Sequence, residues 1–172
     1  MKFANQDFEA QTFKNLDFTE KDLSNAIFID CIFSKCNFSN TKIVGTRFQN
    51  TTFQNCKILG LNFEECSRFL FSFSFLDCLI STSVFSNIKI PDTTFQDSQV
   101  QNCDFFGTDL SGCNFKGSDL EGSRFDDTNM TNTSFRGSTK YNFDPGKNFL
   151  KKTKFSFPEV IALLNAFDIE IE

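Results

Sequence analysis

Large apolar residues recur at every fifth position over most of this chain. Two runs of thirteen such positions follow each other, from Phe3 to Phe63 and from Phe75 to Phe135. Phenylalanine fills ten positions of the first run and seven of the second. A period of five fits neither an α-helix, with about 3.6 residues per turn, nor a flat strand, with a period of about two. It fits a chain that turns a corner every five residues and keeps its apolar side chains inside the coil.

Two other positions of the repeat favour the same coil. The residue two places before the apolar one is mostly small, as at Ala26, Thr46 and Cys103. Residues two apart on an extended segment point the same way, so a large and a small side chain share the interior. The residue two places after it is mostly Asn, Asp or Gly, as at Asn25 and Gly112. These residues tolerate the positive φ of a tight corner, and four corners close a coil of about 20 residues.

The order small residue, Asp or Asn, large apolar residue resembles the pentapeptide-repeat family, as in Thr108-Asp109-Leu110 and Ser118-Asp119-Leu120. The resemblance implies an all-β fold, a right-handed quadrilateral β-helix with a short C-terminal α-helix as its cap. We expect residues 1–140 to form this solenoid and residues 141–172 to form the cap and a dimerisation segment. A solenoid is a scaffold, so its function has to be argued from its surface.

The five-residue repeat shifts by two positions at about residues 64–74. Arg68 falls where the first run requires an apolar residue, and an arginine does not sit in a core unpaired. Phe69 and Phe71 alternate with other residues in the manner of a strand. Two interpretations stay open. The segment is either an insertion tolerated at a corner or a protruding contact element formed by Arg68, Phe69 and Phe71.

The last thirty residues leave the repeat and predict a cap. Ser156 and Glu159 have the spacing of a capping box, and Pro158 suits the first helical turn. The helix should bury one apolar face against the end of the solenoid, which would otherwise expose open strand edges. Ile169 and Ile171 alternate with acidic residues, as a short final strand would. The candidate cap and dimer residues are Phe157, Val160, Leu163, Leu164, Phe167, Ile169 and Ile171.

The tail also carries a second resemblance. The segment from Asp144-Pro145-Gly146-Lys147-Asn148 to Leu164 is similar to the C-terminal ends of pentapeptide-repeat proteins of the Qnr quinolone-resistance and microcin-immunity type. The resemblance implies a homodimer formed through this end. A monomeric cap is the alternative.

Catalytic and metal chemistry have little support in the sequence. Histidine is absent, and six of the seven cysteines occupy the small inward position, as Cys66 also does in the register of the first run. Buried free cysteines act as small hydrophobic residues. The glycines at 107, 112, 117 and 122 are five apart, which indicates corners and not a phosphate-binding loop. We predict no enzymatic activity, no cofactor and no metal site.

Acidic residues concentrate in the second half of the chain. The net charge is -5, which argues against direct binding of nucleic acid. Between residues 92 and 127 there are only two basic residues, and stacking by 20 residues should place Asp104 beside Arg124. These acids are either a solvated surface or a partner-binding surface. The candidates are Asp92, Asp97, Asp104, Asp109, Asp119, Glu121, Asp126 and Asp127.

The family resemblance gives these acids a specific meaning. It implies a DNA mimic that binds DNA gyrase or topoisomerase IV and protects the enzyme from quinolones or from a gyrase-targeting toxin. The alternative is a generic interaction scaffold with another protein partner. The N-terminus lacks an apolar signal segment, and no stretch of about 18 apolar residues is present. We therefore expect a cytoplasmic protein that does not bind membranes.

Overall fold

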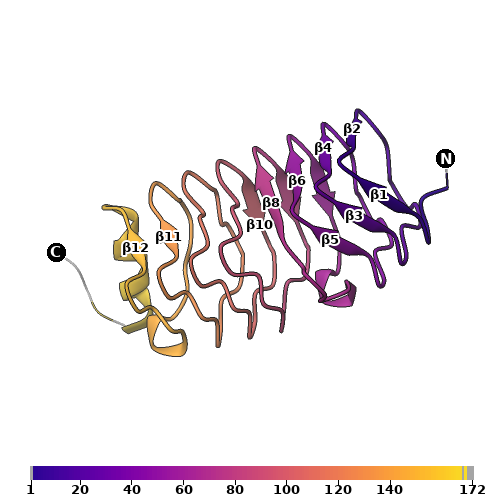
Figure 1. The fold of residues 1–172 in the computed structure, drawn as a ribbon. Helices are drawn as coiled ribbons and strands as arrows, with labels where there is room; N and C mark the ends of the chain where they lie inside the picture. The colour runs from indigo at the N-terminus through magenta and orange to yellow at the C-terminus, as the bar shows by residue number, and fades with distance from the viewer. Residues whose placement is uncertain (1, 168, 170–172) are drawn as a thin grey trace.

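The chain coils into a rod, with the N-terminus at one end and the C-terminus at the other (Figure 1). This computed structural model describes residues 2–167 and 169. The strands are β1 (Asp7–Glu9), β2 (Thr12–Lys14), β3 (Ile27–Ile29), β4 (Ile32–Ser34), β5 (Arg47–Gln49), β6 (Thr51–Gln54), β7 (Lys57–Leu59), β8 (Phe73–Leu76), β9 (Leu79–Ser81), β10 (Gln99–Gln101), β11 (Ser134–Phe135) and β12 (Lys154–Phe155). The helices are η1 (Phe63–Glu65), η2 (Pro145–Lys147) and η3 (Glu159–Phe167), all of the 3-10 type. In the described part of the chain, no helix has the length and apolar character needed to cross a membrane.

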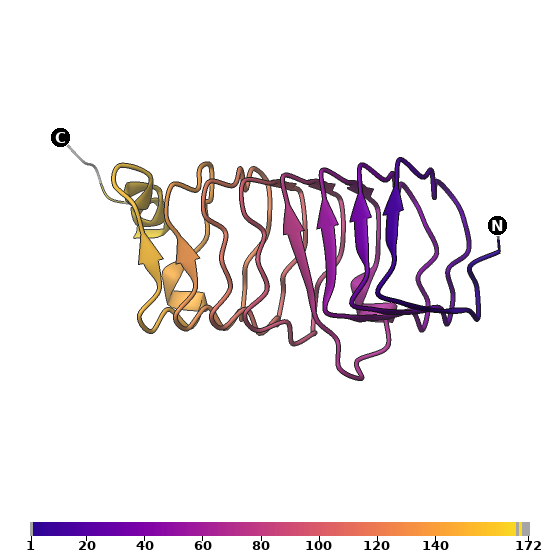
Figure 2. The ribbon, with the colours of Figure 1, turned by 45° about the horizontal axis from the view of Figure 1, so that its top comes forward.

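Successive coils stack in parallel and give the rod four faces, three of which contain strands. Phe8 pairs with Phe28 and Phe28 with Phe48, so each coil repeats after 20 residues. The first face contains β1, β3 and β5. The second face contains β2, β4, β6 and β8 and, farther along the rod, the pair β11 and β12. The third face contains β7, β9 and β10. The fourth face is joined by single bridges such as Asp104 with Arg124. The predicted fold, an all-β right-handed four-sided β-helix, is confirmed, with about seven turns (Figure 2).

The interior is a column of stacked rings. Phe95 is fully buried, and its ring centroid lies 5.1 Å from that of Phe75 and 4.6 Å from that of Phe115. Small polar residues that point inward hydrogen-bond to the backbone of the preceding coil. The Thr46 hydroxyl, for example, donates to the Leu23 carbonyl at 2.8 Å. Buried hydroxyls without partners would be costly, so this regular contact makes the small inward position compatible with Ser and Thr.

The shift in the repeat is absorbed on the first face. Thr51 of β6 pairs with Phe73 of β8, an offset of 22 residues where the other strand pairs have 20. The short helix η1 replaces one corner, and Leu70 takes the next positive φ, 51°. The two extra residues therefore loop out of the wall between Cys66 and Ser72. This loop projects from the side of the rod in Figure 2.

The coils continue to stack beyond residue 140, where the sequence repeat predicts that the solenoid ends. Phe155 of β12 pairs with Phe135 of β11, and Phe149 bridges to Asn129. Tyr141 and Phe143 fill the core of this last coil although they are out of phase with the repeat. Aromatic side chains can thus cover the final rungs from irregular positions, which periodicity alone does not reveal.

The cap is a helix, as predicted, but it is wound as a 3-10 helix and not as an α-helix. With about three residues per turn, positions i and i+3 share a face. Val160 is partly buried and Leu163 is buried, whereas Leu164 and Phe167 are exposed. The prediction that all four residues line one buried face is therefore wrong.

Ser156 does not serve the capping box that its spacing with Glu159 suggests. Its hydroxyl accepts a hydrogen bond from the Gly137 N–H at 3.0 Å, one coil away. Ser156 therefore joins the final coil to the preceding one.

Candidate partner-binding surfaces

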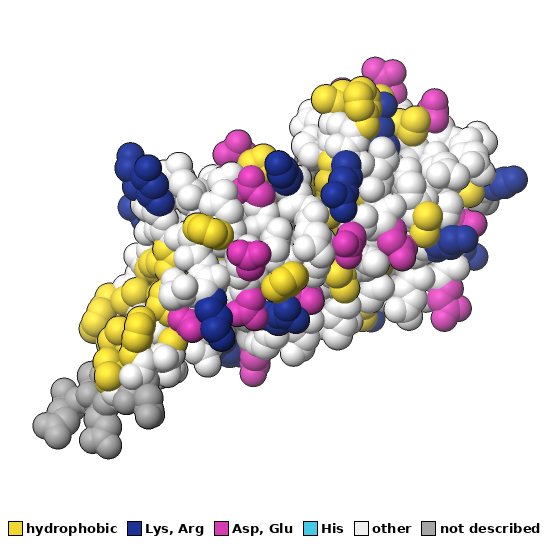
Figure 3. All heavy atoms as spheres, turned by 90° about the horizontal axis from the view of Figure 1, so that it is seen from below, with side chains coloured by type: hydrophobic (Ala, Val, Ile, Leu, Met, Phe, Trp, Pro, Cys, Tyr) yellow, Lys and Arg dark blue, Asp and Glu magenta, His cyan; other side chains and the backbone are white. Residues whose placement is uncertain are grey.

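The eight candidate acids do not gather on one face of the rod. Backbone register places two of them on the first face, Asp92 and Asp109, and one on the second, Asp97. The third face carries Asp119 and Glu121, and the fourth carries Asp104, Asp126 and Asp127. On the face seen in Figure 3, acidic and basic side chains are interspersed along the rod. The acidity of this segment is therefore distributed around the solenoid.

Two cations neutralise half of the candidate acids. Arg124 lies 3.7 Å from Asp104 and 3.2 Å from Asp126, so the predicted neighbourhood of Asp104 and Arg124 is present. Lys140 lies 2.9 Å from both Asp119 and Glu121. Partial burial acts to raise the pKa of Asp119, but hydrogen bonds from Lys140, the Glu121 N–H and Gln101 outweigh it, and the pKa is lowered. Each of these four acids consequently has a cation of the rod as its neighbour.

The other four acids make no ion pair among the described residues. Asp92, Asp97 and Asp127 occupy corners with φ of 57°, 52° and 51°. Asp109 accepts hydrogen bonds at 3.0 Å from the Ser111 N–H and from the Asn129 amide. Asp92 and Asp109 lie on the first face, and Asp127 lies at the corner that leads into it. We call Asp92, Asp109 and Asp127 the acidic patch.

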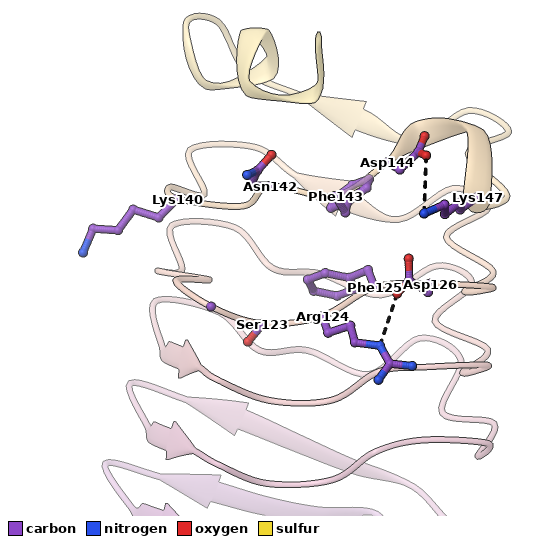
Figure 4. A pocket seen from close by; sticks show the side chains of 10 residues that line it. Ser123, Arg124, Phe125, Asp126, Lys140, Asn142, Phe143, Asp144 and Lys147 are labelled. Atoms are coloured by element: carbon purple, nitrogen blue, oxygen red, sulfur yellow. Dashed lines mark hydrogen bonds and ion pairs between the residues drawn. The ribbon is translucent and has the colours of Figure 1, made fainter. Parts of the chain in front are cut away.

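A cavity of about 430 Å³ opens near the C-terminal end, where residues 141–143 leave the repeat. Figure 4 shows Arg124 paired with Asp126 and Lys147 paired with Asp144 along its wall, while Lys140 points away. The charged side chains that line this cavity therefore largely balance each other. In the part of the chain described by the structure, the lining offers hydrogen-bonding groups but no nucleophile next to a general base.

The loop on the first face carries exposed apolar side chains. Phe69 and Leu70 are 64% and 56% exposed, and Arg68 is exposed beside them. Phe71 turns inward, with its ring 4.7 Å from that of Phe73. The Arg47 guanidinium lies 4.7 Å from the centroid of the Phe69 ring, a cation–π contact that positions the loop. Sequence reasoning found the loop but missed Arg47, which stacking along the first face would have indicated.

The C-terminal end of the rod presents a second apolar surface. Phe157 is 80%, Phe167 56% and Ile169 54% exposed, and Leu164 lies on the same cap. Hydrophobic side chains collect at this end in Figure 3. The remaining candidate of this set, Ile171, lies outside the described residues.

The cysteines are packing residues in the structure. All seven are buried and free. The Cys103 thiol donates to the backbone carbonyls of Ile80 and Gln101, and burial raises its pKa to about 12. Within residues 2–167 and 169, no group of three or more potential ligand side chains is arranged to hold a metal ion.

Comparisons with known proteins agree with this architecture. A sequence model described as pentapeptide repeats matches residues 7–42 and 84–139, and one described as a pentapeptide repeat region matches residues 26–105. No curated protein sequence matches.

Solved structures of similar fold extend over the whole chain. A trypsin-treated variant of QnrB1, described as a plasmid-mediated fluoroquinolone resistance protein, is 21% identical, with a TM-score of 0.50 over 99% of this chain and 92% of that one. HetL, a pentapeptide repeat protein involved in heterocyst differentiation regulation in Nostoc sp. strain PCC 7120, is 12% identical, with a TM-score of 0.41 over 89% of each chain. The sequence repeats, their match to the family model over more than half of the chain and the four-sided solenoid together show that this chain belongs to the pentapeptide-repeat family.

Proposed function

We propose that this protein is a non-enzymatic rod that binds a type II topoisomerase, DNA gyrase or topoisomerase IV, in competition with DNA, and so protects it from a quinolone or a toxin. The observation that carries the proposal is the acidic patch, because its three carboxylates lack ion-pair partners among the described residues. A carboxylate that is free of internal cations remains available to Lys and Arg of a DNA-binding surface. The full-length likeness to QnrB1, a fluoroquinolone resistance protein, supports this choice of partner.

The distribution of charge indicates which acids can contact the topoisomerase without breaking ion pairs within the rod. A mimic that used all eight acids would have to break the pairs with Arg124 and Lys140. A contact through Asp92, Asp109 and Asp127 requires no such rearrangement. Association should therefore be salt-dependent but driven by few charges, since exposed charges are screened within about 8 Å at physiological salt.

Cleavage assays with gyrase and a quinolone test this proposal. We expect the protein to reduce the amount of drug-stabilised cleaved DNA, and the variant D92N/D109N/D127N to need about tenfold more protein for the same effect, if each lost contact contributes a factor of two to three. The matched control is D104N/D119N/D126N, which removes the same number of charges from acids that are already paired. Its protection should change by less than about threefold.

Two results would decide against this function. Absence of both protection and topoisomerase binding at low salt would remove the topoisomerase as partner. Equal loss in the two triple variants would show that net charge, and not the acidic patch, governs the contact. The alternative function, a scaffold for another protein partner, rests on the exposed aromatic residues of the loop and the cap, since aromatic side chains are enriched at interface hot spots.

Two copies of the protein are proposed to meet at their C-terminal ends. The support is the exposure of Phe157, Leu164 and Phe167 on the cap, which leaves apolar surface in water. We expect the wild type to have the mass of a dimer in light scattering, and F157E/L164E/F167E to be monomeric. Phe69→Glu, on the side wall, is the control that should leave the mass unchanged. A monomeric wild type at about 0.1 mM, a concentration at which a specific dimer should persist, would refute the dimer.

We also propose that the protein acts in the cytoplasm. A reducing compartment keeps buried thiols free, as all seven are here. Fractionation of cells that express the full chain tests this assignment.

A further inference from the structure

The loop on the first face borders a group of cations that have no carboxylate partner. The Arg47 guanidinium stacks on the Phe69 ring, and Arg68, which belongs to the loop, lines a cavity together with Lys89. None of these three cations forms an ion pair within the part of the chain that the structure describes. The side-chain Nε of Arg47 is buried and lacks a hydrogen-bond partner. The same guanidinium donates to the Gln49 side-chain oxygen and stacks on Phe69, so Arg47 holds the loop while its positive charge has no counter-charge among the described residues.

A small cavity completes this surface. Its volume is about 220 Å³, and it is lined by Arg68, Phe71, Asn87, Ile88 and Lys89. Two cations and an amide face the same space as two apolar side chains. This combination suits a carboxylate that is attached to a short aliphatic stem, because the charged head and the stem each find a matching wall.

The nearby acids Glu64 and Asp109 do not pair with these cations. Glu64 accepts a long hydrogen bond, 3.4 Å, from the Asn87 amide. Asp109, the register neighbour of Lys89, accepts from Ser111 and Asn129. Neither carboxylate is within ion-pair distance of Arg68 or Lys89, so the positive charge of the cavity is directed to solvent.

From these contacts we infer that the loop and its cavity form a docking site for an acidic segment of a partner protein, with a carboxylate between Arg68 and Lys89 and an apolar neighbour against Phe69 and Leu70. The exposed ring and the leucine would be poor contacts for a phosphate backbone, and the net charge of -5 opposes nucleic acid. The site is opposite in sign to the acidic patch and does not depend on the proposed topoisomerase contact.

Fluorescence anisotropy with a labelled nine-residue peptide, Glu-Glu-Leu repeated three times, tests the docking site. We expect saturable binding at low salt that weakens about tenfold in R47Q/R68Q/K89Q, if each lost charge contributes a factor of two to three. The control K14Q/K42Q/K57Q removes three exposed cations from the other faces and should bind like the wild type. A peptide with Gln in place of Glu should not bind.

The outcomes separate the alternatives. If R47Q/R68Q/K89Q does not fold, R68Q/K89Q alters only exposed side chains and should still weaken binding about fivefold. No saturable binding, or equal weakening in the control variant, overturns the proposal. Displacement of the peptide by single-stranded oligonucleotide at lower concentration than by unlabelled peptide would overturn it in favour of nucleic acid. No topoisomerase is present in this assay, so its failure and the failure of the topoisomerase proposal are distinguishable.

Discussion

Replacing Phe95 by alanine is expected to destabilise the protein by about 3–5 kcal/mol, the usual range for removing a large buried aromatic side chain. Phe95 is fully buried and stacks between Phe75 and Phe115. Its ring also meets those of Phe85 and Phe105 edge-on at 5.7 and 5.9 Å. The rigid walls on either side cannot collapse into the space left behind, so a cavity would remain in the middle of the column.

Urea denaturation followed by circular dichroism measures this loss. Phe149→Ala is the matched control, because the same kind of side chain is 60% exposed in the last coil and its removal should change the free energy of unfolding by less than about 0.5 kcal/mol. In a solenoid each coil contacts only its neighbours. The loss at Phe95 should therefore also uncouple the coils before it from the coils after it, so that the two parts unfold at different urea concentrations. A change below about 1 kcal/mol would contradict the continuous column.

Raising the pH from 9 to 10 is expected to destabilise the fold by roughly 3 kcal/mol through the three buried thiols of Cys66, Cys103 and Cys113. Burial raises the pKa of Cys103 from 9.0 to about 12 and also raises the pKa values of Cys66 and Cys113. Above the unfolded value the unfolded chain releases these protons while the folded chain retains them. The folded state then binds more protons, so its stability falls as pH rises toward the folded pKa. For each thiol the loss is about 1 kcal/mol between pH 9 and 10, and it approaches about 1.4 kcal/mol per pH unit well above the unfolded pKa.

The variant C66T/C103S/C113T distinguishes the contribution of these three thiols to the pH dependence of stability from that of other groups. Thr and Ser already occupy the same inward position at Thr46, Ser83 and Thr93, where they are buried. Tyr141, whose pKa burial raises to about 12, shifts stability in the same direction and remains in the variant, as do Cys31, Cys36 and Cys56, whose pKa values are also raised. Denaturation midpoints between pH 8 and 10 should fall for both proteins, and more steeply for the wild type than for the variant. Parallel curves for the two proteins would show that the thiols are not responsible.

Periodic constraints explain why so much of the fold follows from the sequence. Every inward side chain meets the equivalent residue of the next coil, so positions such as Phe95, Thr46 and Gly112 are each selected by one repeated environment. The same stacking predicted the Asp104–Arg124 pair, which the structure contains. The two-residue shift near Arg68 was visible because an arginine cannot replace Phe in the column.

Non-periodic features depended on tertiary contacts. Tyr141 and Phe143 cover the last rungs from positions outside the repeat, and Ser156 bonds to Gly137 one coil away. The cap helix is of the 3-10 type, so Leu164 and Phe167 face outward. Local spacing describes such segments poorly because their side chains pack against whatever the end of the rod presents.

The repeat by itself determined the four-sided solenoid, its corners and its buried cysteines, because one apolar position in five can be buried in only one kind of coil. Only the tertiary structure decided which charges are available on the surface. Arg124 and Lys140 pair with four of the candidate acids, while Arg47 and Lys89 form no ion pair with any residue that the structure describes. Outward side chains carry no periodic constraint, so their partners are set by the face and the coil in which each residue lies.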